Sequence, residues 1–174
     1  MKNYFAFFWL AMLCLVSCNS QVEVTPKYPL KELLHEKSWK VVSIQAERKS
    51  DGEVLDWYEQ LPACIKDNIF FTEAPGTGAV GELHAEEGST LCKENDLSYI
   101  PHIAGWKLND DHSIFSVSLF DSGHSMLYGY ETEESYTFEN WMVDELNEKY
   151  MQIKVDKIFE EHAYTFTIRF EVTN

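Results

Sequence analysis

The sequence predicts an all-β protein built from antiparallel strands. Residues 113–120, 150–155 and 163–172 alternate apolar and polar side chains, so each segment is expected to form a strand with one buried and one exposed face. Turn-forming clusters separate the apolar segments and lie at residues 50–52, 75–78, 109–111 and 121–123. About eight short strands with this spacing indicate a β-sandwich or a β-barrel rather than a parallel α/β fold.

The expected elements follow one another along a single domain. A short amphipathic helix is expected over residues 30–37, because Leu30, Leu33 and Leu34 recur at helical spacing. The expected strands span residues 39–47, 68–73, 79–85, 105–108, 113–120, 135–143, 150–155 and 163–172. A further short helix is expected within residues 56–66, in the connection between the first two strands.

The first residues have the layout of an export signal. Lys2 supplies a positive charge, and the apolar run that follows ends at Leu15-Val16-Ser17-Cys18. An apolar run of about 13 residues is too short to cross a bilayer as a helix. The ending resembles a bacterial lipobox, which implies that residues 1–17 are removed and that Cys18 is acylated. An uncleaved anchor and an ordinary secretory signal are the alternatives.

The rest of the chain is expected to be a tether, residues 18–29, followed by one domain, residues 30–174. The chain is 45% hydrophobic and 14% aromatic, which is enough for a packed core. Its formal net charge of −15 would repel nucleic-acid phosphates and anionic lipid head groups. We therefore expect no nucleic-acid partner, and membrane attachment through the acyl chains alone.

Two of the four cysteines remain after the leader and the lipidated residue are set aside. Cys64 and Cys92 form an even pair in an exported chain, and an oxidising compartment favours a disulfide between them. The alternative, Cys64 as a catalytic nucleophile, has no supporting sequence signature around it.

Several short motifs occur together in residues 30–174. Trp39 opens the first expected strand, Cys64-Ile65-Lys66-Asp67-Asn68 leads into Phe70-Phe71, and Cys92 and Trp106-Lys107-Leu108 follow. This combination resembles the lipocalin-like lipoproteins of Bacteroidota, whose domain is of the calycin type. The resemblance implies an eight-stranded up-and-down barrel with a short N-terminal helix near its base. Lys37-Ser38-Trp39 departs from true lipocalins, which usually have Gly-x-Trp at this place.

Motifs for cofactor or metal chemistry are weak in this sequence. Residues 76–81 fit G-x-G-x-x-G, but a strand-like segment follows where a dinucleotide site needs a helix. His84 and Glu86 have the spacing of two side chains on one strand face, whereas the adjacent pairs Asp111-His112 and Glu161-His162 do not. No spacing gathers the three or four ligands of a zinc site, so we expect no metal and no cofactor.

Aromatic residues supply the remaining indication of function. Eight-stranded barrels either fill their interior with side chains or leave room for one small ligand. The residues expected to line such an interior are Phe115, Leu119, Phe138, Met151, Phe166 and Ile168. Trp141 is expected on the opposite, solvent-facing side, where it would mark a protein-docking patch.

Three function hypotheses follow. The first is a membrane-anchored, non-enzymatic barrel that binds a small apolar ligand. The second is an envelope lipoprotein with a filled barrel that docks a protein partner. The third is a hydrolase, for which no Gly-x-Ser-x-Gly motif is present. Because Asn19 is not the aspartate that retains some lipoproteins at the inner membrane, we expect the outer membrane, on its periplasmic face.

Overall fold

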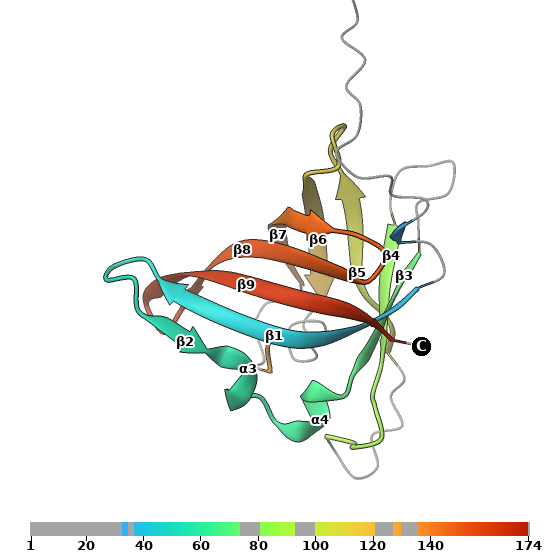
Figure 1. Ribbon diagram of the computed structural model, residues 1–174, viewed down its shortest axis with the longest axis horizontal. Helices are drawn as coiled ribbons and strands as arrows, with labels where there is room; N and C mark the ends of the chain where they lie inside the picture. The colour runs from blue at the N-terminus through green and yellow to red at the C-terminus, as the bar shows by residue number, and fades with distance from the viewer. Residues whose placement is uncertain are drawn as a thin grey trace, which may run out of the picture.

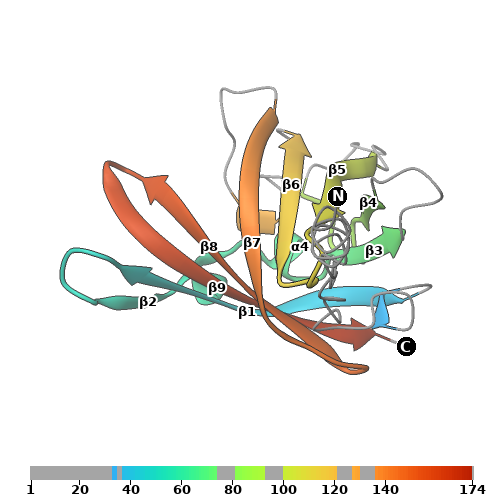
Figure 2. The same ribbon diagram turned by 90° about the horizontal axis from the view of Figure 1, so that it is seen from above.

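The structure is a computed structural model that describes residues 33–34, 37–73, 81–92, 100–120, 127–129 and 136–173. Within these residues the chain forms an antiparallel β-barrel, seen from two directions in Figures 1 and 2. The expected leader, Cys18, the tether and most of the expected helix at 30–37 lie outside the described residues. Neither helix in the described part of the chain is long and apolar enough to cross a membrane.

The elements follow the order expected for an up-and-down fold. The strands are β1 (Ser38–Arg48), β2 (Val54–Asp56), β3 (Ile69–Glu73), β4 (Gly81–Glu86), β5 (Ile100–Leu108), β6 (Ile114–Phe120), β7 (Tyr136–Leu146), β8 (Tyr150–Phe159) and β9 (His162–Thr173). The helices are α3 (Trp57–Gln60) and α4 (Ala63–Lys66). The expected helix within residues 56–66 is therefore two short helices, separated at Leu61 and Pro62.

Pairing between the first and last strands closes the barrel. β1 pairs with β9 from Ser38↔Thr173 to Arg48↔Tyr164, while consecutive strands pair from β3 through to β9. On its other edge β1 pairs with β3 near Trp39 and with β2 near Ala46. β2 is thus an extra strand beside a closed barrel of eight, and the predicted all-β, up-and-down architecture is confirmed.

Inward-facing side chains of the strands form one hydrophobic core. Trp39 opens β1 as expected and is 1% exposed, with its indole N–H donating to Thr72 Oγ1 at 3.3 Å. The Thr72 hydroxyl in turn donates to the Leu34 carbonyl at 2.8 Å, so the chain before β1 is fixed to β3. Leu33 and Leu34 are both buried in this core.

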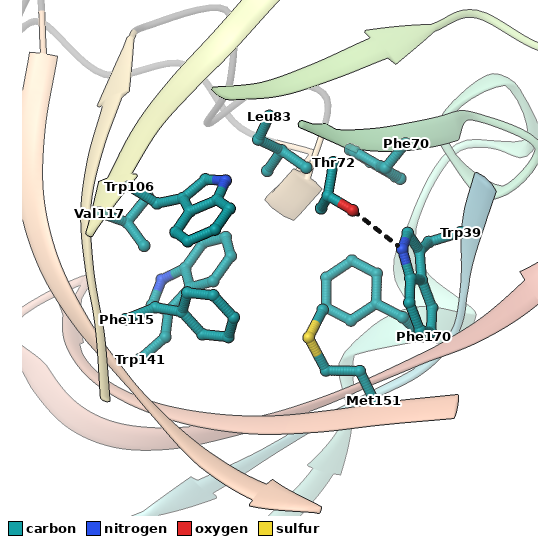
Figure 3. Close-up of a pocket in the computed structure, with 10 residues that line it drawn as sticks. All are labelled: Trp39, Phe70, Thr72, Leu83, Trp106, Phe115, Val117, Trp141, Met151 and Phe170. Atoms are coloured by element: carbon teal, nitrogen blue, oxygen red, sulfur yellow. Dashed lines mark hydrogen bonds between the residues drawn. The ribbon is translucent and has the colours of Figure 1, made fainter. Parts of the chain in front are cut away.

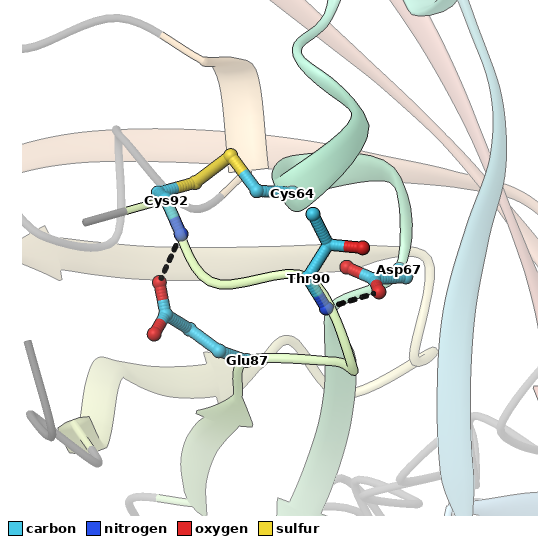
Figure 4. The surroundings of a disulfide bond; sticks show 5 residues. All are labelled: Cys64, Asp67, Glu87, Thr90 and Cys92. Carbon is cyan, nitrogen blue, oxygen red and sulfur yellow. Dashed lines mark hydrogen bonds between the residues drawn. A yellow bond between two sulfur atoms is a disulfide. The ribbon is translucent and has the colours of Figure 1, made fainter. Parts of the chain in front are cut away.

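The Cys-x-x-Asp-Asn motif fastens α4 to the segment that follows β4 (Figure 4). Cys64 and Cys92 form a disulfide, with Cα atoms 5.1 Å apart, which confirms the predicted bridge. Asp67 Oδ2 accepts from the Thr90 backbone N–H at 3.0 Å. A Cβ on Gly88 would lie 2.3 Å from Asp67 Cγ, so only glycine allows this close approach. The motif is therefore a structural clamp on residues 88–92.

Candidate functional site

The barrel interior contains a small apolar cavity (Figure 3). Its volume is about 20 Å³. Its lining residues are Trp39, Phe70, Thr72, Leu83, Trp106, Phe115, Val117, Trp141, Met151 and Phe170. Sites for small organic ligands have volumes of about 300–1,000 Å³. The cavity is therefore a packing defect and does not hold a ligand of that size.

A water molecule is also a poor occupant of this cavity. About 10–15 Å³ is enough room for one water, but a buried water needs two or more polar partners. Thr72 has the only hydroxyl among the lining residues, and it already takes part in two hydrogen bonds, with Trp39 and Leu34. Edge-to-face packing of Trp106 on Phe115, with ring centroids 5.3 Å apart, fills the neighbouring space.

Five of the six residues expected to line the interior are buried there. Phe115 and Met151 line the cavity, while Leu119, Phe166 and Ile168 lie deep in the core with no exposed surface. They fill the barrel and pack on one another. Ligand contact by these five residues stays a prediction.

Phe138 lies on the outer face of the barrel and is 78% exposed, so its prediction as an interior residue is wrong. Trp141, expected to face solvent, is 3% exposed and lines the cavity, so that prediction is wrong as well. Directly paired residues of antiparallel strands share a face, and the register pairs Trp141 with buried Phe115 and Phe138 with Ser118. The two aromatic residues lie on opposite sides because their positions differ by an odd number.

A larger hollow lies at the end of the barrel where β1 ends and β9 begins. We call it the end groove; its volume is about 540 Å³, within the range of small-ligand sites. Its lining residues are Arg48, Leu55, Trp57, Gln60, Leu61, Pro62, Tyr128, Gly129, Phe159, Glu160, His162 and Tyr164. The groove thus combines apolar and aromatic walls with polar groups that make up about half of its surface.

Aromatic contacts fix the floor of the end groove. The Trp57 ring meets Phe159 edge to face at 4.8 Å between centroids and Phe166 at 5.1 Å. The Trp57 indole N–H donates to the Tyr128 carbonyl at 3.0 Å. Gly129 has φ +76°, and a Cβ there would lie 2.6 Å from Leu61 Cδ2. Residues 127–129 are therefore held against α3 and the residues that follow it.

A buried ion pair lies below Tyr128 inside the barrel. Lys157 Nζ lies 2.7 Å from Glu139 Oε1, and the two side chains are 8% and 7% exposed. Glu139 Oε2 accepts from the Tyr128 hydroxyl and from the Trp141 indole N–H, both at 2.7 Å. Lys157 Nζ also lies 3.7 Å from the centre of the Tyr128 ring. Burial lowers the pKa of Lys157, while Glu139 acts in the opposite direction.

The positive charge on the groove rim is already paired. Arg48 makes ion pairs with Asp51 at 3.0 Å and Glu53 at 2.8 Å. Hydrogen bonding to Tyr164, followed by that to Asp51, raises the pKa of Arg48 above its ordinary value. Because this guanidinium is permanently charged but neutralised by its partners, the groove does not select strongly for an anionic ligand.

The paired carboxylates expected of a glycoside hydrolase are not evident at the end groove. Glu139 is buried below it, but its two oxygens already bond to Lys157, Tyr128 and Trp141. Glu160 lines the groove on the tight turn between β8 and β9.

The residue pairs that were considered as metal ligands, although no metal was expected, lie in different surroundings. His84 and Glu86 share the outer face of β4, but the carboxylates close to His84 are those of Glu82 and Glu73. Asp111 Oδ1 accepts from the Ser113 hydroxyl and backbone N–H, which lowers the pKa of Asp111 and shapes the turn before β6. The segment after residues 76–80 is strand β4, as expected for a hairpin, and those five residues lie outside the described part.

Comparison with family models, with curated proteins and with solved structures finds no match to this chain. The closed antiparallel barrel is compatible with a lipocalin-like fold. The end groove could not be predicted from the sequence, because its walls come from four separate stretches of the chain, residues 48, 55–62, 128–129 and 159–164. Tyr128 and Trp57 are 71 positions apart and share no motif.

Proposed function

We propose that this protein is a membrane-anchored lipoprotein that binds a small, largely apolar molecule in the end groove, without transforming it. The observation that carries the proposal is the difference in volume between the two hollows, about 540 Å³ at the groove against about 20 Å³ in the interior. The aromatic rings of Trp57, Tyr128 and Phe159 offer flat apolar contact surfaces. Gln60 and His162, both exposed, offer hydrogen bonds to a polar end of the ligand.

A dye-binding measurement tests the ligand-binding part. The full chain in detergent is titrated with 8-anilino-1-naphthalenesulfonate, an amphipathic dye with apolar rings and one sulfonate, whose fluorescence rises when the rings are buried. Gln60→Trp places a large ring in the groove and is expected to weaken dye affinity at least tenfold. Ile158→Trp adds the same bulk at a position that is 78% exposed on the outer face, and is expected to change affinity less than twofold.

Two results would contradict binding of the dye in the end groove. One is a parent chain whose signal does not exceed that of detergent alone. The other is an equal loss of affinity in Gln60→Trp and Ile158→Trp. Because all proteins are compared at the same detergent concentration, partition of the dye into micelles cancels between them.

The lipid anchor rests on the Leu-Val-Ser-Cys ending of the leader and is tested separately. Cells expressing the chain are grown with labelled palmitate, and the label on the protein is measured. Cys18→Ser is expected to abolish labelling because it removes the acylated thiol. Cys14→Ser, four positions earlier, is expected to leave labelling unchanged. Equal labelling of parent and Cys18→Ser contradicts the anchor.

A second candidate function is docking of an envelope protein on the outer face of β5, β6 and β7. Phe138 lies there beside a shallow hollow of about 300 Å³ that includes Gly105, Ser116 and Ser118. An exposed aromatic ring over small residues is a feature of protein-binding surfaces. Cross-linking in cells is expected to lose its product in Phe138→Ser but not in Ile158→Ser, which removes an equally exposed side chain.

A further inference from the structure

Three side chains able to bind a metal ion converge on the outer face of the β3–β4 hairpin. Glu73, the last residue of β3, pairs directly with Glu82 on β4, and His84 follows two positions later on the same face. One ligand atom from each of the three residues lies within 4.8 Å of the others. None of them lines the end groove, which lies at the far end of β1 from this hairpin.

The distances fit a tetrahedral ion. His84 Nε2 lies 3.2 Å from Glu82 Oε2 and 3.8 Å from Glu73 Oε1. Zinc bonds of about 2.0–2.2 Å at tetrahedral angles place neighbouring ligand atoms about 3.3–3.6 Å apart. The two separations from His84 bracket that range, and the two carboxylate oxygens lie within 4.8 Å of each other, so rotation of these exposed side chains would complete the geometry. The imidazole, only 15% exposed, is held in place by its surroundings.

Charge also favours a cation at this position. Like charges directly opposite each other on adjacent strands are destabilising, and Glu73 and Glu82 form such a pair. Imidazole nitrogen with carboxylate oxygens suits zinc, whereas magnesium and calcium prefer oxygen ligands throughout.

We propose that Glu73, Glu82 and His84 bind one zinc ion, with water in the fourth position. The ion would cross-link the ends of β3 and β4 and offset the repulsion between the two carboxylates. This inference is independent of the end groove, so either one stands if the other fails. The alternative is that His84 contacts the same two carboxylates directly and leaves no place for a metal.

Calorimetric titration with zinc chloride tests the site. The full chain is prepared without a histidine tag, with its disulfide oxidised and its free thiols alkylated, because thiolates bind zinc. The parent is expected to take up one equivalent that magnesium chloride does not displace. Glu82→Gln and Glu73→Gln are each expected to weaken zinc binding at least tenfold, and His84→Gln to abolish uptake at this site.

Glu86→Gln is the matched control, because it removes one charge from the same face of β4 without touching the three ligands. It is expected to change zinc affinity less than twofold. Cobalt bound in place of zinc is expected to show the intense visible absorption of a tetrahedral ion in the parent and in Glu86→Gln. Circular dichroism checks that all variants fold.

Three outcomes overturn the proposal. The parent takes up no zinc, or only at millimolar concentration. Glu86→Gln weakens zinc binding as much as Glu82→Gln does, which shows that the loss of affinity comes from net charge alone. Zinc uptake survives in His84→Gln, which identifies an adventitious ion only.

Discussion

The two ends of the barrel interior differ in chemistry. Near the start of β1 the interior is apolar, and rings such as Phe70 and Phe170, with centroids 6.0 Å apart, close around a cavity of about 20 Å³. Near the end of β1 the interior contains the Lys157–Glu139 ion pair below Tyr128, and the end groove lies above it. The apolar end is thus closely packed, whereas the polar end carries the hollow in which we propose that a ligand binds.

The largest expected effect is on the free energy of unfolding, for a variant at the apolar end of the barrel. Phe170→Ala removes a side chain that is 1% exposed, and is expected to lower the free energy of unfolding by about 3–5 kcal/mol. Phe138→Ala makes the same change on the outer face and is expected to cost less than about 1 kcal/mol. Urea denaturation measures both. Similar losses in the two variants would show that the assignment of inner and outer faces on β7 is wrong.

The next effect tests the polar end. Lys157→Met leaves the Glu139 carboxylate buried without its cation, so the free energy of unfolding is expected to fall by about 3 kcal/mol. Adding Glu139→Gln removes the charge but keeps an oxygen that accepts from Tyr128 and Trp141, and most of the loss is expected to be recovered. The same denaturation experiment compares the two. A double variant no more stable than Lys157→Met contradicts a specific buried pair.

A smaller effect concerns the turn that joins β8 and β9 at the polar end. Glu160 and Glu161 have φ values of 46° and 67°, in the left-handed region that favours glycine and asparagine. Glu161→Gly is expected to raise the free energy of unfolding by about 0.5–1 kcal/mol, since it removes a Cβ that disfavours this backbone. Glu161→Val, a β-branched residue, is expected to lower it. Thermal melting distinguishes the signs, and the opposite order would refute a strained turn.

The smallest effect depends on pH. Lys49 Nζ lies 2.6 Å from Asp156 Oδ2, and this hydrogen bond lowers the pKa of Asp156 below its ordinary value. A carboxylate with a lowered folded-state pKa stabilises the fold above its unfolded pKa of about 3.9, and the contribution is lost as pH falls through the folded value. Lys49→Met is therefore expected to cost less than about 1 kcal/mol at pH 7, because both groups are exposed.

The prediction for Lys49 is tested by measuring the free energy of unfolding by urea at several pH values. The difference between parent and Lys49→Met is expected to shrink as the pH falls below about 3.9. A difference that stays constant from neutral to acidic pH would assign the effect of Lys49 to packing.

The strands were predictable from local sequence because apolar and polar residues alternate within each segment. All eight expected strands occur, and the helix within residues 56–66 is present as α3 and α4. β2 was not predicted, since Val54–Asp56 is too short to show a period. The disulfide could be predicted because only Cys64 and Cys92 remained as an even pair.

The wrong prediction for Phe138 shows that alternation within one strand does not decide which face is buried. Tyr136 and Phe138 alternate in one phase and Trp141 and Val143 in the other, so β7 alone fits either face inward. Pairing with β6 chose the second phase, because it places Trp141 beside buried Phe115. Sequence also paired His84 with Glu86, whereas the partner from β3, Glu73, became visible only through the strand register.

The amino-acid sequence alone determined that the chain is β-rich and antiparallel and which two cysteines bond, because these features follow from short-range alternation and from counting. Tertiary structure decided which aromatic rings face inward, how completely they fill the barrel and where a ligand-sized hollow opens. Those properties depend on the register and close packing of strands distant in sequence, where a shift of one residue exchanges the inner and outer faces.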